Sequence, residues 1–478
     1  MIDSGEELSM NARMRVLMTR GFVVAVLVVL PALASVRPQQ PADRFVVSDV
    51  MIPMRDGVRL HTKIFVPKEP REPLPIIMKR TPYGVEGSAS NFVAYLKALA
   101  DDGCIFAFQD IRGKFGSEGP FVMQRPARAP GDMSALDEGT DTYDTIEWLL
   151  KNVPRNNGRV GMLGVSYDGW TTIMGALEPH PALKAISPQA SPADMWLGDD
   201  FHHNGAFRLS YAFEYAAMME SSKEVQQFAF DRYDTFDWYL ALGPLANANA
   251  RYLHGKIPTW NDYVAHPDYD EFWKRQTMIP HIRDVKVPTL NVAGWWDQED
   301  FYGPVRIYDA LERYDTKRLN YLVVGPWNHG GWSRGTGERL GAIPFDGPTS
   351  QYFRDEVQAR WFAYFLKDKG TLDAPEALTF EAGSNRWRRW DAWPPRRNTE
   401  DRDLYFGPDE ALSFERPTDA GDQTFNSYVS DPAHPVPYRH RPIQATYFPG
   451  GSKWSTWLVE DQRFVDDRAD VLSWESAP

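Results

Sequence analysis

A serine in a glycine-rich turn is the first candidate for chemistry in this sequence. Ser166 stands in Gly164-Val165-Ser166-Tyr167-Asp168-Gly169, which contains the pattern G-x-S-x-G. An apolar run at 160–163 precedes the turn, and a helical pattern at 170–177 follows it. Between a strand and a helix, small flanking residues allow a sharp turn that exposes the serine hydroxyl above the sheet. The pattern therefore predicts that Ser166 is a nucleophile.

Two further strand-like runs each end at a residue that a serine nucleophile needs. Asp297 follows the run 287–293, and His329 follows the run 319–324. The order serine, aspartate, histidine is the one found along α/β-hydrolase chains. His329 would accept the hydroxyl proton and return it to the leaving group, while Asp297 would hold the imidazole tautomer and stabilise the imidazolium. The three residues predict acyl transfer through a covalent acyl-enzyme.

Acyl transfer also needs hydrogen-bond donors for the tetrahedral oxyanion. The backbone N–H of Tyr167, the residue after the nucleophile, is predicted to be one donor. The second should come from the loop after the short strand 76–78. That loop reads Lys79-Arg80-Thr81-Pro82-Tyr83-Gly84 and has no glycine run to offer a backbone N–H. The phenol of Tyr83 is therefore the candidate for the second donor.

The elements that must position these residues alternate between strand and helix. Strand-like runs lie at 76–78, 105–108, 160–163 and 183–186, and helical patterns cover 92–100, 170–177, 351–367 and a segment that starts at 141. The alternation predicts a mostly parallel sheet with helices on both faces. Ahead of it, residues 44–66 read as a hairpin around the turn Arg55-Asp56-Gly57.

The remaining segments suggest three regions in a chain of 478 residues, which is long enough for several domains. From 193 to 284 strand alternation stops and aromatic residues recur, which predicts a helical cap over the strand ends. The α/β-hydrolase domain would then comprise 35–192 and 285–370. After residue 370, short β segments separated by turns predict a C-terminal all-β domain over 371–478.

The first 34 residues have the features of an export signal. Three arginines precede an apolar stretch at 21–30, and Ala32-Leu33-Ala34 is a cleavage pattern. The apolar stretch is shorter than a membrane-spanning helix needs. We therefore expect a periplasmic or secreted protein with no stable membrane insertion after cleavage, and a retained N-terminal anchor is the alternative.

Composition argues against several other classes of function. The net charge of −13 argues against a nucleic-acid surface, which needs a basic stripe. The single cysteine, Cys104, lies in an apolar run, so no intramolecular disulfide can form and a buried core position is expected. The string Asp199-Asp200-Phe201-His202-His203 offers metal-ligand side chains. Adjacent histidines rarely face one ion, however, and a serine triad makes a metal redundant, so we expect neither a metal nor a cofactor.

Four motifs taken together resemble those of a known family. They are Arg80-Thr81-Pro82-Tyr83, Asp110-Ile111-Arg112-Gly113, the turn 164–169 and Gly325-Pro326-Trp327-Asn328-His329. The family contains cocaine esterase and the X-Pro dipeptidyl peptidases, and the resemblance is greatest to the α-amino acid ester hydrolases. It implies an α/β-hydrolase domain, a helical cap and a C-terminal jelly-roll, and it supports a tyrosine hydroxyl as oxyanion donor. The family's jelly-roll is longer than the segment present here, so an incomplete C-terminal domain is expected.

The same resemblance gives a role to three acidic residues. α-Amino acid ester hydrolases hold the α-ammonium group of the substrate with a carboxylate cluster, which maps onto Asp200, Glu299 and Asp300. Carboxylates crowded into a partly dry pocket need a cation to stay ionised together. A solvated acidic loop is the alternative interpretation of these residues.

The expected protein is a serine hydrolase that cleaves esters or amides of α-amino acids. The resemblance also implies acyl transfer to β-lactam amines. The alternatives are a general carboxylesterase of the cocaine esterase type, an X-Pro dipeptidyl peptidase, and an inactive relic or binding module. The sequence does not decide the physiological substrate, and it leaves a homo-oligomer open.

Overall fold

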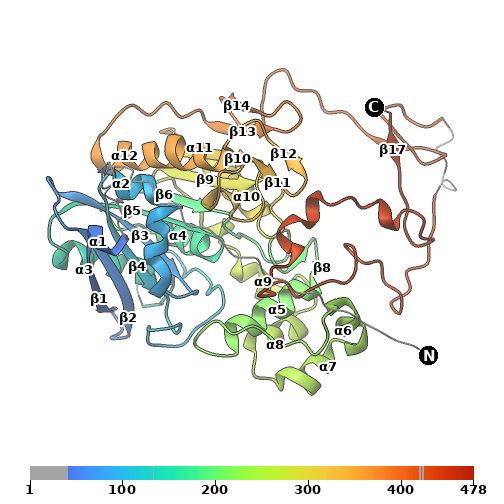
Figure 1. Ribbon diagram of the computed structural model, residues 1–478, viewed down its shortest axis with the longest axis horizontal. Coiled ribbons are helices and arrows are strands. Elements are labelled where there is room, and N and C mark those ends of the chain that lie inside the picture. The colour runs from blue at the N-terminus through green and yellow to red at the C-terminus, as the bar shows by residue number, and fades with distance from the viewer. Residues whose placement is uncertain (1–40, 133, 419–420, 422–424, 478) are drawn as a thin grey trace, which may run out of the picture. The chain divides into compact units, whose positions relative to one another are not determined.

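The computed structural model describes residues 41–132, 134–418, 421 and 425–477 (Figure 1). The expected signal peptide, residues 1–34, lies outside these ranges, and export stays a prediction. Within the described ranges, no helix combines the length and the apolar character that crossing a membrane requires.

A ten-stranded sheet carries the candidate residues, in the order β1-β2-β4-β3-β5-β6-β9-β10-β13-β14. The strands are β1 (Phe45–Pro53), β2 (Arg59–Pro67), β3 (Leu74–Thr81), β4 (Ile105–Asp110), β5 (Asn156–Val165), β6 (Leu183–Gln189), β9 (Thr289–Gly294), β10 (Asn320–Gly325), β13 (Ala377–Glu381) and β14 (Arg386–Trp390). Neighbours from β4 to β13 are parallel. The pairs β1–β2, β2–β4 and β13–β14 are antiparallel. This is the mostly parallel sheet that the alternating pattern predicted.

Helices cover both faces of the sheet because successive side chains of a strand point to opposite sides. Ile76 and Met78 of β3 belong to the same core as Ile173 of α4. Ile77, between them, packs instead in the core that contains Leu366 of α12. The helices of the first face are α3 (Glu138–Asn152), α4 (Tyr167–Leu177) and α10 (Tyr302–Glu312), and those of the second are α2 (Lys97–Asp101) and α12 (Ala359–Lys367). Cys104 is buried in the second core, as predicted.

One predicted helix differs from the structure. The segment 92–100 is not a continuous helix but the end of a 3₁₀ segment, η1 (Glu86–Val93), followed by the short α2. Ser90 and Asn91 donate side-chain hydrogen bonds to the carbonyl oxygens of Gly87 and Ser88. Such local bonds compete with the α-helical ladder. The helix expected to start at 141 begins at Glu138, because Asp137 caps it by accepting the backbone N–H of Thr140.

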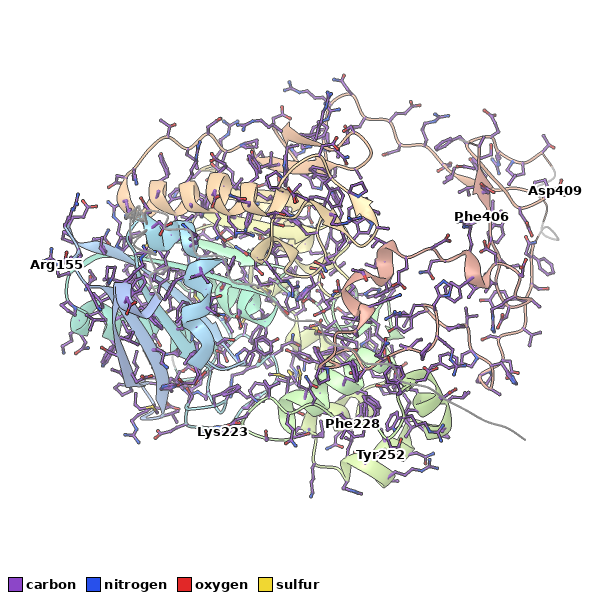
Figure 2. All side chains as sticks on the ribbon, in the orientation of Figure 1. Arg155, Lys223, Phe228, Tyr252, Phe406 and Asp409 are labelled. Atoms are coloured by element: carbon purple, nitrogen blue, oxygen red, sulfur yellow. The ribbon has the colours of Figure 1, made fainter. Side chains whose placement is uncertain are left out.

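The segment predicted to be a helical cap is largely helical. It contains α5 (Leu209–Glu220), α6 (Thr235–Leu242), α7 (Ala246–Ala248), α8 (Pro258–Ala265), α9 (Glu271–Gln276) and a small hairpin, β7 (His202–His203) with β8 (Ala206–Phe207). Its aromatic side chains pack mainly on one another. The Trp238 ring lies 5.2 Å from Phe213, 5.4 Å from Phe228 and 4.9 Å from Tyr252, the last two labelled in Figure 2. These residues form an aromatic cluster that is continuous with the core on the α4 face of the sheet.

The C-terminal region differs from the prediction where it begins. We expected a separate β domain from residue 371, but β13 and β14 extend the main sheet, and Leu378 pairs in parallel with Val323 of β10. Leu378 is buried in the sheet core, and this burial explains why the strand joins the α/β domain. Further on, β15 (Tyr405–Phe406), β16 (Ala411–Ser413) and β17 (Glu475–Ser476) form a separate three-stranded sheet. The α/β domain therefore continues past residue 370.

Candidate active site

Ser166 occupies the sharp turn between β5 and α4. Its backbone has φ 65° and ψ −128°, a conformation that non-glycine residues rarely adopt and that concentrates at functional sites. A Cβ at Gly164 would lie 2.3 Å from the carbonyl oxygen of Asp168. A Cβ at Gly169 would lie 2.5 Å from that of Gln189. Both glycines are thus required by close backbone approaches, and the turn has the form that exposes a nucleophile.

Asp297 and His329 meet because they follow parallel neighbours, β9 and β10, whose ends lie at the same edge of the sheet. His329 Nδ1 lies 2.9 and 3.0 Å from the two carboxylate oxygens of Asp297. The Asp297 side chain is fully buried and also accepts the backbone N–H groups of Glu299 and Asp300, each at 2.9 Å. A carboxylate held in this way can orient an imidazole for proton transfer.

The pKa of His329 is set by opposing effects. Burial by itself would lower it, but the carboxylates of Asp297 and Glu299 raise the pKa of His329 to about 9. The imidazole of the free protein is therefore mostly protonated at neutral pH. A general base must be neutral, so His329 could act as one only after it has lost this proton.

Ser166 and His329 line one open cleft of about 680 Å³. Its walls are rich in aromatic side chains, which are Tyr83, Tyr211, Tyr215, Tyr447, Phe448 and Trp454. Polar side chains also line it, among them Gln298, Glu299 and Arg334. A cleft that combines aromatic walls with polar groups is typical of a small-molecule site.

The two predicted oxyanion donors come from different parts of the chain. Tyr167 is the first residue of α4, where backbone N–H groups have no acceptor within the helix. Tyr83 follows β3 and lines the cleft with Ser166, and its hydroxyl lies 2.9 Å from that of Tyr215. Tyr83 is 36% exposed as a whole residue, but desolvation of its phenol, with the Asp168 charge, holds the pKa of Tyr83 well above its usual value. The hydroxyl therefore keeps its proton and can donate it in a hydrogen bond.

The three predicted ammonium ligands lie together, although only Glu299 is among the cleft-lining residues. Asp200 and Asp300 are 3% and 0% exposed. Burial and the Glu299 charge raise the pKa of Asp200 to about 7. Burial and the Asp200 charge likewise raise the pKa of Asp300.

These buried acids have few partners of their own. Both carboxylate oxygens of Asp300, and Oδ1 of Asp200, have no hydrogen-bond partner among the described residues. In the same part of the chain, no lysine or arginine forms an ion pair with Asp200, Glu299 or Asp300. Buried carboxylates without a cation favour the binding of a positively charged ligand.

The rest of the acidic and histidine string is structural. Asp199 accepts the backbone N–H groups of Ala193, Asp194 and Gly303 at 2.8 to 2.9 Å, so it ties the cap entrance to α10. His202 Nδ1 lies 3.0 Å from the carbonyl oxygen of Met195. The residue pattern alone could not separate Asp199 from Asp200. Only the fold shows that backbone N–H groups donate to the carboxylate of Asp199, which leaves Asp200 as the candidate ligand.

One wall of the cleft was not predicted from the sequence. It comes from residues 438–460, which we call the C-terminal strap and which cross beside the cap in Figure 1. Glu214 of α5 accepts the N–H and hydroxyl of Thr446 at 2.8 and 3.2 Å. Asn328, next to His329, donates to the carbonyl oxygen of Ser455 at 2.8 Å. No motif in the strap signals this role, because its contacts lie more than a hundred residues away in the chain.

Trp454 brings the strap to the acidic cluster. Its indole N–H donates to Glu299 at 3.0 Å, and its ring stacks on Tyr211 with centroids 5.3 Å apart. The guanidinium of Arg208 lies over both rings, 5.3 Å from Tyr211 and 5.5 Å from Trp454. Tyr211 also donates to Glu299 at 2.8 Å. These two donors help to fix the Glu299 carboxylate within the cleft.

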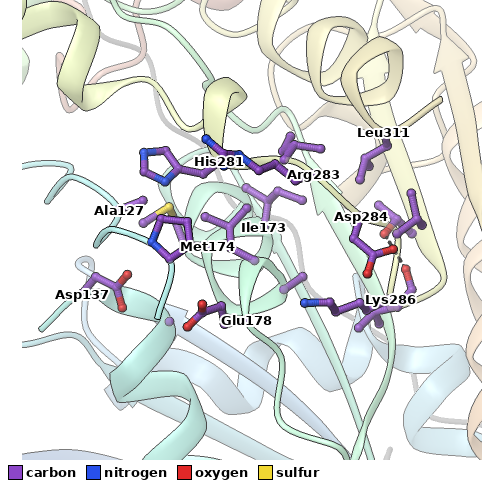
Figure 3. Close-up of a pocket in the computed structure, with 18 of the residues that line it drawn as sticks. Ala127, Asp137, Ile173, Met174, Glu178, His281, Arg283, Asp284, Lys286 and Leu311 are labelled. Atoms are coloured by element: carbon purple, nitrogen blue, oxygen red, sulfur yellow. Dashed lines mark hydrogen bonds between the residues drawn. The ribbon is translucent and has the colours of Figure 1, made fainter. Parts of the chain in front are cut away.

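A separate cavity of about 130 Å³ lies beside the linker between the cap and β9. Figure 3 shows Met174, Glu178, His281, Asp284 and Leu311 around it. No predicted site residue is among the described residues that line this cavity. The candidate chemistry therefore belongs to the cleft that contains Ser166.

Comparisons with known proteins agree with this geometry. The family model described as X-Pro dipeptidyl-peptidase (S15 family) matches residues 56–331. Cocaine esterase from Rhodococcus sp. (strain MB1 Bresler) is 28% identical over 461 residues, covering 90% of this chain and 74% of its own.

Two solved structures are more similar in sequence. An aminopeptidase from a marine sediment Thaumarchaeota archaeon is 42% identical, with a TM-score of 0.85, and the match covers 91% of this chain and 72% of that one. An α-amino acid ester hydrolase is 38% identical, also with a TM-score of 0.85, and the match covers 95% and 76% of the two chains. These matches confirm the α/β-hydrolase fold class. The chain belongs to the X-Pro dipeptidyl-peptidase (S15) family and is a hydrolase of the serine esterase and peptidase type.

Proposed function

We propose that this protein hydrolyses esters or amides of α-amino acids through an acyl-enzyme on Ser166. The observation that carries the proposal is the group of buried acids beside His329, in which Asp300 has no partner for either carboxylate oxygen. A primary ammonium group supplies both the charge and the three N–H donors that such acids lack. The similarity to an aminopeptidase and to an α-amino acid ester hydrolase supports a substrate with a free amino group.

The reaction follows from the positions of the side chains. His329 takes the hydroxyl proton as Ser166 Oγ attacks the carbonyl carbon, and Asp297 stabilises the imidazolium. The carbonyl oxygen becomes an oxyanion that accepts hydrogen bonds from the Tyr167 N–H and the Tyr83 hydroxyl. Collapse breaks the bond to the alcohol or amine, which leaves with the proton from His329. Water, deprotonated by His329, then hydrolyses the acyl-enzyme.

The Tyr83→Phe variant tests the oxyanion assignment. We expect it to lower kcat by about 100- to 1000-fold, because that is the usual cost of losing one oxyanion donor. Steady-state hydrolysis of an amino ester measures the effect. Tyr215→Phe is the matched control, since it removes the hydroxyl next to Tyr83 and leaves the proposed donor in place. Equal losses in the two variants would contradict the role of Tyr83.

The ammonium site is tested with two esters that differ only in the α-amino group. We expect phenylglycine methyl ester to be hydrolysed with a much higher kcat/KM than phenylacetic acid methyl ester, with Ser166→Ala as the blank. In Asp200→Asn the preference should fall by about 10-fold or more, because a charge-assisted hydrogen bond to the ammonium is lost. Hydrolysis of the phenylacetic ester should not fall in that variant, because this ester has no ammonium group to bind.

Equal rates with the two esters would reject the ammonium site and leave a general carboxylesterase of the cocaine esterase type. An X-Pro dipeptidyl peptidase also requires a free amine, so the esters do not separate it from the proposed activity. Proline-containing dipeptide amides do, because only the dipeptidase should prefer them. A protein that is folded but reacts with neither ester nor fluorophosphonate would be a non-catalytic relic or a binding module.

We also propose that the acyl-enzyme can transfer its acyl group to β-lactam amines instead of to water. The cleft is open, so an amine can reach the acyl-enzyme in place of water. Phenylglycine methyl ester mixed with a β-lactam nucleus that carries a free amine should then yield the coupled amide. Hydrolysis without any coupled product at high amine concentration would restrict the activity to water as acceptor.

A further inference from the structure

His329 contacts a carboxylate at each of its two ring nitrogens. Nδ1 faces Asp297, as acid-base catalysis requires, whereas Nε2 lies 3.4 Å from Oε2 of Glu299. In a working triad Nε2 must face the nucleophile. Ser166 Oγ, however, makes no hydrogen bond to His329 or to any other residue in the described part of the chain. In the free protein, the catalytic nitrogen is therefore paired with Glu299 and not with Ser166.

Glu299 is held firmly in this position. Oε2 accepts from the Tyr211 hydroxyl at 2.8 Å, and Oε1 accepts from the Trp454 indole and the Gln298 amide, both at 3.0 Å. Its side chain is only 11% exposed, so water screens its charge little. Glu299 is also the one member of the acidic cluster that lines the cleft. A substrate ammonium that enters the cleft therefore meets the carboxylate that pairs with His329.

We propose that Glu299 is a positioning residue that keeps the triad latched in the free enzyme, and that the substrate ammonium releases the latch by taking over Glu299. This inference rests on the proposed α-amino substrate. The imidazolium then loses its Nε2 proton to solvent, and the neutral Nε2 becomes free to accept the proton of Ser166. The amino group would thus both anchor the substrate and switch on the base. An ester without an amino group would leave the latch closed.

The charges around His329 are consistent with such coupling. Burial opposes its charge, while Asp297, Glu299 and Asp200 favour it and raise the pKa of His329 to about 9. A bound cation would offset the contributions of Glu299 and Asp200 and lower that pKa. The other titratable side chains that line this part of the cleft are Arg334, Tyr83, Tyr211, Tyr215 and Tyr447, with Arg208 and Asp300 behind Glu299. The phenols keep their protons throughout the neutral range, because burial raises their pKa values.

The test uses inactivation by a neutral fluorophosphonate, which reports attack by Ser166 without a deacylation step. The second-order rate should rise with pH to a midpoint near 9 in potassium chloride, because His329 must lose its proton. Methylammonium chloride at equal ionic strength should lower the midpoint by about one unit or more, which raises the rate at pH 7 by about tenfold. Tetramethylammonium, which has no N–H donor, should leave the profile unchanged.

Glu299→Gln should show a lower midpoint in potassium chloride and no further response to methylammonium. Glu338→Gln is the control for loss of an acidic charge, because Glu338 lies on the exposed loop after His329 and, among the described residues, its side chain bonds only Thr336. If Glu299→Gln does not fold, the salt comparison on the unmodified protein still decides the question.

Identical midpoints in methylammonium and potassium salts, or an unchanged midpoint in folded Glu299→Gln, would overturn the latch. The ester comparison separates this failure from that of the proposed function. A strong preference for phenylglycine methyl ester with identical midpoints would reject the latch alone. Equal ester rates with identical midpoints would reject both.

Discussion

Ser166→Ala should lower kcat for phenylglycine methyl ester by on the order of 10⁶-fold, because the covalent route is lost with the hydroxyl. Ser166 has a positive φ in a strained turn. Alanine also carries a Cβ and pays the same conformational cost there, so the turn should persist in the variant. The remaining rate would come from the oxyanion donors and substrate binding. Steady-state hydrolysis measures the loss, and labelling by fluorophosphonate should disappear with it.

Ser333→Ala is the matched control for this prediction. Ser333 lines the same cleft, but its hydroxyl donates to the carbonyl oxygen of Gly330 and has no catalytic assignment. The control should retain both hydrolysis and labelling. If Ser166→Ala kept a rate within about tenfold of the unmodified protein, the acyl-enzyme route would be wrong.

Asp297→Asn should lower kcat by about 10⁴-fold. The asparagine oxygen can still accept the N–H groups of Glu299 and Asp300, so the loop should keep its form. Its amide nitrogen, however, would donate toward Nδ1 of His329. The imidazole would then carry its proton on Nε2, where it could not accept the proton of Ser166.

Asp315→Asn provides the comparison for the structural part of this substitution. Asp315 likewise accepts backbone N–H groups, three in all, from Lys317, Leu319 and Asn320 at 3.0, 2.7 and 2.8 Å, but it is not among the residues that contact His329. The control should retain activity, with any loss confined to stability. Comparable losses of kcat in the two variants would assign Asp297 a purely structural role.

The candidate triad could be named without the fold because its signals are local. Ser166 is marked by flanking glycines, and Asp297 and His329 each follow an apolar strand-like run. Parallel strands end at one edge of a sheet, so residues that follow neighbouring strands are brought together. The acidic cluster was different, because Asp199 and Asp200 are indistinguishable in composition and their assignment came from a family resemblance.

Elements with weak local patterns were predicted less well. The segment 86–101 became a 3₁₀ stretch and a short helix because Ser90 and Asn91 bond to the nearby backbone. The residue pattern of the short strand 377–381 is the same whether the strand begins a separate β domain or extends the main sheet. Pairing with β10 decided between these, and that pairing depends on residues more than fifty positions away.

Chain periodicity and turn chemistry were enough to predict the fold class and a candidate order of nucleophile, acid and base, because both act over a few residues. The packing of distant segments decided the rest. The strap reaches the cleft through Thr446 and Trp454, which bond to Glu214 and Glu299 far away in the chain. Folding also places Glu299 against His329, where the burial of both side chains strengthens their electrostatic coupling. Such coupling depends on distance and dielectric environment, and neither is written in the local sequence.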